Sequence, residues 1–137
     1  PLYSNTTLVV LFPTLAAGGC AVLSARFDAA AYLELAERWR VTHTMLVPVQ
    51  YQRLMAVPGF DAHALSATRF KFCTSAPFPA ELKAEVLRRW PGGLVETYGL
   101  TEGGGATMLE AHLHPGADLP VRHPGAEAGV AAQALCR

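Results

Sequence analysis

Residues 69–105, which read RFKFCTSAPFPAELKAEVLRRWPGGLVETYGLTEGGG, contain two strand-like segments separated by a helical one. Its first six residues alternate apolar and polar side chains as a strand does, and two prolines then open a helix over residues 80–90. A Pro-Gly-Gly stop ends that helix, and residues 94–98 form a second strand-like run. Strand, helix and strand in this order predict a right-handed β-α-β unit with parallel strands.

The sequence before this unit shows the same alternation of helical and strand-like segments. It predicts helices at residues 7–16, 29–40 and 49–55, and strands at residues 20–24 and 43–48. Short strands alternating with helices of ten or more residues are typical of an α/β fold with a parallel sheet. We therefore expect parallel β-α-β units along most of the chain.

Composition narrows the class of protein. The chain has 137 residues, of which 51% are hydrophobic and 16% charged, with a net charge of zero. This length fits one modest domain or a piece of a larger one, and the balanced charge indicates no nucleic acid partner. No apolar run reaches the roughly 20 residues that span a bilayer, so we expect no transmembrane segment and a cytoplasmic location. The oligomeric state does not follow from the sequence.

Two loops are candidates for a binding site. Open parallel sheets bind ligands outside the carboxyl ends of their strands. The loops at residues 74–77 and 99–105 each follow a predicted strand, and one helix separates them. Because the ends of two parallel strands emerge at the same edge of a sheet, we expect these loops to flank one crevice.

The second loop has the chemistry of a magnesium–nucleotide site. Gly99 and the glycines at 103–105 leave backbone amides bare for phosphate oxygens, and Thr101 adds a hydroxyl donor. Glu102 fits beside phosphates if Mg²⁺ lies between them, and Tyr98 offers a flat face to a nucleobase. The alternative is a plain glycine loop with a solvated carboxylate, and the residue types alone leave it open.

Several motifs resemble those of one family. Residues 98–102, YGLTE, resemble the YGxTE motif of the adenylate-forming (AMP-binding) superfamily, which includes acyl- and aryl-CoA synthetases, luciferases and adenylation domains. Residues 74–77, TSAP, resemble the loop that lies along the adenine in that family. Shorter matches occur at residues 1–3, 27–28, 41–43 and 47–48. Residues 1–115 thus resemble an incomplete large N-terminal domain of such an enzyme, in its central part.

The resemblance implies roles for individual residues. Tyr98 would stack on adenine, Thr101 would hydrogen-bond the α-phosphate, and Glu102 would ligate Mg²⁺. It implies Thr101 and Glu102 as the catalytic residues. The implied nucleotide-binding residues are Ser75, Ala76, Pro77, Tyr98, Gly99 and Thr101. The implied substrate pocket is Tyr3, Asn5, Val47 and Tyr51, although a plain core position is an equal alternative for Tyr51.

The implied reaction uses ATP and coenzyme A. A carboxylate would attack the α-phosphorus of ATP, giving acyl-AMP and pyrophosphate, and coenzyme A would then take the acyl group as a thioester. Positioning and charge neutralisation would carry the catalysis. We expect a fatty or related carboxylic acid rather than an amino acid, because no acidic residue occurs before Asp28 to pair with a substrate ammonium.

Departures from the family leave alternatives open. The family's lysine-bearing phosphate loop and its domain with the catalytic lysine have no counterpart in these 137 residues, so we expect the chain to be inactive alone. Residues 116–137 are rich in alanine, glycine and proline, and we expect an atypical tail, truncated or frame-shifted. The alternatives are a non-catalytic α/β relic without turnover and an adenylation domain with another acyl acceptor.

Overall fold

Helices and strands alternate along the chain, as the sequence predicts. The structure, a computed structural model, describes residues 3–100 and 104–110. Its helices are α1 (Asn5–Ala16), α2 (Ala29–Arg38), α3 (Pro48–Met55) and α4 (Ala80–Arg89), with a 3₁₀ turn η1 (Phe60–Ala62). Its strands are β1 (His43–Leu46), β2 (Phe70–Cys73), β3 (Gly93–Leu100) and β4 (Gly104–Glu110). Among the helices of these described ranges, none has the length and apolar character needed to span a bilayer.

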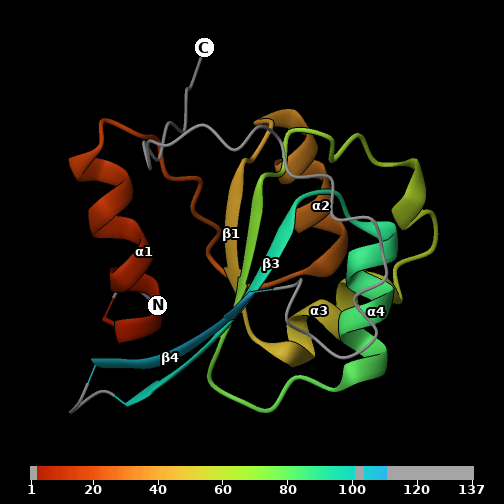
Figure 1. Cartoon of the computed structure of the whole chain (residues 1–137). Coiled ribbons are helices and arrows are strands. Elements are labelled where there is room, and N and C mark those ends of the chain that lie inside the picture. Colours follow the sequence, from red (N-terminus) through yellow and green to blue (C-terminus); the bar gives the residue numbers. More distant parts are fainter. Residues whose placement is uncertain (1–2, 101–103, 111–137) are drawn as a thin grey trace.

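The four strands form one sheet in the order β1-β2-β3-β4. The first three strands are parallel, and β4 runs antiparallel to β3. Helices α2, α3 and α4 gather on one side of the sheet, and α1 lies apart from them beyond β1 (Figure 1). The predicted parallel β-α-β units are therefore confirmed, and the mixed α/β class with them.

Two expectations about strands were wrong. Residues 20–24 follow an irregular path, because no strand of the described sheet pairs with them. An apolar run forms a strand only where an adjacent strand is available to pair with it. Gly99, Gly104 and Gly105 lie in strands rather than in a loop, because β3 and β4 pair as an antiparallel hairpin. The connecting residues 101–103 are outside the described ranges.

The hydrophobic core lies between the sheet and helices α2, α3 and α4. Trp90 is fully buried at its centre, with its ring edge-on to Tyr32 and Phe60 at centroid distances of 6.2 and 5.8 Å. The indole nitrogen donates a hydrogen bond to Thr68 Oγ1 at 3.0 Å, which satisfies the one polar group of the ring. The C-terminal end of α4 is thereby attached to the segment that leads into β2.

A buried lysine holds the turn that follows α4. Lys71 of β2 has no exposed surface, and its Nζ donates to the carbonyl oxygens of Trp90, Pro91 and Gly92 at 2.9, 2.7 and 2.6 Å. Burial lowers the pKa of Lys71 to about 7. The three carbonyls act in the other direction, because three acceptors match the three N–H donors of an ammonium group. Lys71 thus donates to carbonyl groups of the kind that the C-terminal end of a helix leaves without an N–H partner.

Glycine is required in the same turn. Gly92 has a φ of +88°, and a Cβ atom there would lie 2.6 Å from the carbonyl oxygen of Thr68 and 2.7 Å from that of Arg69. Only a residue without a side chain allows the turn to approach the start of β2 so closely. The next residue, Gly93, donates its N–H to the Arg69 carbonyl at 2.7 Å, and β3 begins there.

We predict that Lys71→Met lowers the free energy of unfolding by about 2–4 kcal/mol, because three carbonyls lose a charged donor while the volume stays similar. Urea titration monitored by far-UV circular dichroism measures this. Arg53→Met is the matched control, since Arg53 is an exposed residue in the last turn of α3 and should cost less than about 1 kcal/mol. Equal losses in the two variants would contradict the role of Lys71.

Candidate functional site

The carboxyl ends of the three parallel strands form the candidate site. Leu46, at the end of β1, pairs with Cys73, which in turn pairs with Glu96 of β3. The segments that continue from these positions therefore emerge side by side at one edge of the sheet. They contain Val47 after β1, Ser75 to Pro77 after β2, and Tyr98 to Leu100 in the last part of β3. The parallel strands β2 and β3 thus end at one edge of the sheet, whereas the crevice expected between residues 74–77 and 99–105 stays a prediction, because residues 101–103 lie outside the described ranges.

The loop after β2 presents a short exposed surface. Ser75, Ala76 and Pro77 are all exposed, and the next residue, Phe78, is buried. The ring of Phe78 stacks on that of Tyr51 with centroids 5.3 Å apart, which anchors the loop to the core. Ser75 has a φ of +75°, a left-handed conformation that costs a non-glycine residue free energy. Such local strain is common at binding sites.

Tyr98 lies on the neighbouring strand, β3, and its aromatic ring is exposed. Its side chain is 63% exposed, so its face is available to a planar ligand. One residue earlier, Thr97 Oγ1 donates to the carbonyl oxygen of Cys73 at 3.4 Å, and this contact joins the ends of β2 and β3. On the helix side, Glu96 forms an ion pair with Lys83 of α4. These contacts hold the end of β3 while leaving the tyrosine ring uncovered.

The start of α1 reaches the same edge. Thr6 Oγ1 lies 3.5 Å from Ser75 Oγ, although 69 residues separate the two in sequence. Asn5, in the first turn, and Tyr3, just before it, are both exposed. Val47 is half-buried, and its N–H donates to Gln50 Oε1 at 3.0 Å at the start of α3. Of the predicted pocket residues, Val47 directly follows β1, and Asn5 is adjacent to Thr6, which contacts the loop after β2.

Tyr51 is fully buried, unlike the other predicted pocket residues, and the structure favours the core alternative for it. Its side chain has no exposed surface, its hydroxyl donates to the Phe72 carbonyl at 2.8 Å, and burial raises its pKa well above the ordinary value. The buried positions of α3 are Pro48, Tyr51, Leu54 and Met55. This helical spacing is visible in the sequence and marks Tyr51 as part of the inward face.

The phosphate end of the predicted site lies outside the described residues. Thr101 and Glu102 belong to the segment 101–103, so their predicted roles toward the α-phosphate and Mg²⁺ stay predictions. Within residues 3–100 and 104–110, no group of three or more histidine, cysteine, aspartate or glutamate side chains could hold a metal ion.

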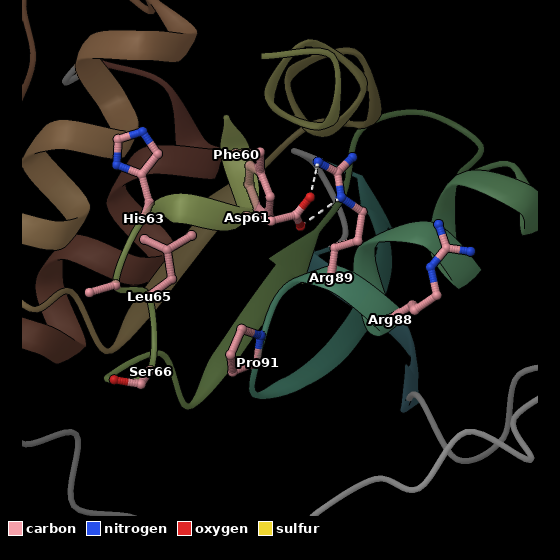
Figure 2. A pocket seen from close by; sticks show the side chains of 9 residues that line it. Phe60, Asp61, His63, Leu65, Ser66, Arg88, Arg89 and Pro91 are labelled. Carbon is pink, nitrogen blue, oxygen red and sulfur yellow. Dashed lines mark hydrogen bonds and ion pairs between the residues drawn. The ribbon is translucent and has the colours of Figure 1, made fainter. Parts of the chain in front are cut away.

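A separate hollow of about 350 Å³ lies at the opposite end of the sheet, beside η1 and the end of α4 (Figure 2). Its charged groups largely neutralise one another. Arg89 donates to both carboxylate oxygens of Asp61, at 2.9 and 3.0 Å, and also to Glu85 and the Met55 carbonyl. Arg88 points away from this pair. The bound guanidinium and the lowered pKa of Asp61 beside it indicate a structural ion pair rather than a ligand site.

We predict that Ser75→Gly raises the free energy of unfolding by about 0.5–1 kcal/mol, because glycine adopts a positive φ without steric cost. Urea titration is again the measurement. Ser66→Gly is the matched control: Ser66 is exposed in a loop and is not among the residues with positive φ, so added chain freedom should destabilise that variant slightly. A loss of stability in Ser75→Gly would show that the left-handed conformation is absent in solution.

Known proteins are similar to this chain in sequence and in fold. The chain is 40% identical to the indoleacetate–CoA ligase of Aromatoleum aromaticum over 90 residues, and these residues cover 66% of this chain and 18% of that protein. It is 35% identical over 96 residues to 4-coumarate–CoA ligase 3 of Arabidopsis thaliana, or 69% of this chain and 17% of that protein. The structure of ATP-bound MatB from Rhodopseudomonas palustris superposes with a TM-score of 0.70 at 30% identity, covering 80% of this chain and 22% of that one.

The chain spans less than a fifth of the length of these two curated relatives. Its match to the family described as AMP-binding enzyme extends over residues 1–133. The motifs at residues 74–77 and 98–102, from which the family resemblance was inferred, thus lie within a match that covers nearly the whole chain. The chain belongs to the AMP-binding enzyme family.

Proposed function

We propose that this chain is the adenine-binding part of an AMP-forming ligase that joins a carboxylic acid to coenzyme A. One observation carries the proposal. The exposed loop Ser75 to Pro77 follows β2, and the exposed ring of Tyr98 lies in the last part of the neighbouring strand β3, in a chain of the AMP-binding family. The carboxyl edge of the strands is where open α/β sheets bind their ligands.

Each residue of this edge has a role in the proposal. The purine stacks on Tyr98, and the loop Ser75 to Pro77 lines its side. Gly99, with no side chain, lets the phosphates approach the backbone of β3. Thr101 donates its hydroxyl to the α-phosphate, and the carboxylate of Glu102 is the Mg²⁺ ligand. The metal, when bound, neutralises phosphate charge, while the residues of this chain orient the α-phosphorus for attack by the substrate carboxylate.

The acid is proposed to be apolar and to enter beside the first turn of α1. Thr6, which follows Asn5, lies against Ser75, and residues 3–25 contain no charged side chain. An amino acid substrate would bring an ammonium group into this uncharged surrounding without a partner. The ligases for indoleacetate and 4-coumarate are named for aromatic carboxylic acids, which favours an aromatic acid within the apolar class. A fatty acid is the other member of that class.

The test is a substrate panel on a complete AMP-binding enzyme that carries this chain. Adenylation is measured by ATP–pyrophosphate exchange with indoleacetate, 4-coumarate, a medium-chain fatty acid and phenylalanine. We predict exchange with one or more of the first three acids and at least tenfold less with phenylalanine. Preferred adenylation of the amino acid would overturn the proposed acid, and exchange with no acid would favour a relic without turnover.

A further inference from the structure

Lys83 of α4 is a charged side chain to which the proposed function above gives no role. Only 16% of its side chain is exposed, and removing an ammonium group from water costs free energy that its partners must offset. It has two partners. The carboxylate of Glu96 on β3 forms an ion pair with it, and the ring centroid of Phe78 lies 5.9 Å from Nζ. One ammonium group therefore contacts both β3 and the segment that precedes α4.

Glu96 lies on the same face of β3 as Tyr98. Successive side chains of a strand point to opposite faces, so Leu94, Glu96 and Tyr98 share one face. Leu94 belongs to the hydrophobic core, which identifies this as the face that the helices cover. Exposure increases along the row, from the buried Leu94 through Glu96, at 21%, to the open ring of Tyr98. Lys83 thus fixes β3 at a point two residues, or about 7 Å, before Tyr98.

Phe78 links the same lysine to the loop Ser75 to Pro77. It directly follows that loop, is buried, and stacks on Tyr51 with ring centroids 5.3 Å apart. An ammonium group within about 6 Å of a ring centroid is attracted to the face of the ring. Lys83 therefore helps to hold the residue at which the loop ends. Each of the two segments proposed to bind adenine has one contact to this lysine.

The ion pair is the strongest polar link described for the last part of β3. The other link, from Thr97 Oγ1 to the Cys73 carbonyl, is 3.4 Å long, which exceeds the usual range for a hydroxyl donor. A bond between two charged groups is stronger than one between neutral groups, and partial burial reduces its screening by water. The position of β3 relative to α4 therefore depends mainly on Lys83 and Glu96.

We propose that Lys83 is a positioning residue for the nucleotide: through Glu96 and Phe78 it keeps Tyr98 and the loop Ser75 to Pro77 at the spacing that adenine requires. This inference rests on the proposed function, because it concerns the same edge of the sheet. Lys83 acts through its two partners and contacts no reacting atom. Its loss should therefore weaken ATP binding, because a site displaced by a fraction of an ångström binds less well, while the acid is bound as before.

The test is ATP binding, measured by isothermal titration calorimetry on a complete AMP-binding enzyme that carries this chain. We expect Lys83→Met to raise the Kd for ATP about tenfold. The KM for ATP in ATP–pyrophosphate exchange should rise by a similar factor, while the KM for the acid changes less than about twofold. Lys83→Arg keeps a cation for the carboxylate and the ring, so its Kd should stay within about threefold of the unsubstituted value.

A second ion pair of α4 supplies the matched control. Asp61 of η1 pairs with Arg89 near the C-terminal end of α4, away from the strand ends (Figure 2). Asp61→Asn and Glu96→Gln each remove one carboxylate charge from an ion pair between α4 and a neighbouring element. Glu96→Gln should weaken ATP binding as Lys83→Met does, whereas Asp61→Asn should leave it unchanged. Urea titration of each variant measures the accompanying loss of stability.

Several results would overturn the positioning role. They are unchanged ATP binding in Lys83→Met, equal weakening by Asp61→Asn, a KM for the acid that rises as much as that for ATP, or a loss in Lys83→Arg as large as in Lys83→Met. If the unsubstituted enzyme binds ATP and adenylates an acid, these outcomes remove only the role of Lys83. If the unsubstituted enzyme binds no ATP, the proposed function fails, and this inference fails with it.

Discussion

The ammonium group of Lys71, buried against the three carbonyls of residues 90–92, fixes the geometry on which the rest of the structure depends. It holds the end of α4 against β2, so β3 must begin at Gly93 in register with Phe70. Each strand residue advances about 3.3 Å, and a fixed beginning therefore fixes the far end of the strand. The position of Tyr98 along the sheet is consequently set by an interaction at the opposite edge.

Much of the fold follows from the sequence because local signals and tertiary packing agree there. Prolines before α4 and glycines after it mark its ends. The short apolar runs on either side of this helix are typical of paired strands. Two parallel strands joined by one helix end at a common edge of their sheet, so the sequence could predict that the segments after β2 and at the end of β3 emerge at that edge. The family motifs point to the same two segments, and the match to the AMP-binding family agrees with them.

The features of the fold that the sequence does not predict depend on tertiary contacts, which leave no local sequence pattern. Lys71 occupies a polar position in an alternating strand, and only the approach of the 90–92 turn shows that its ammonium is buried. Residues 20–24 are apolar but find no strand to pair with. The glycines from Gly99 to Gly105 suggest a loop, whereas antiparallel pairing draws several of them into β3 and β4. The burial of Tyr51, in contrast, could be predicted from the sequence, because the helical spacing of α3 marks it as inward-facing.

The proposed function requires that adenine binds at the strand ends that carry the loop Ser75 to Pro77 and Tyr98. A titration of the ¹⁵N-labelled 137-residue chain with AMP, followed by backbone amide chemical shifts, tests it most directly. We expect the largest shift changes at Ser75, Ala76, Tyr98 and Gly99, while the amides of the hollow in Figure 2 stay unchanged. Shift changes centred on His63, Ser66 and Arg88, or none at millimolar AMP, would contradict it.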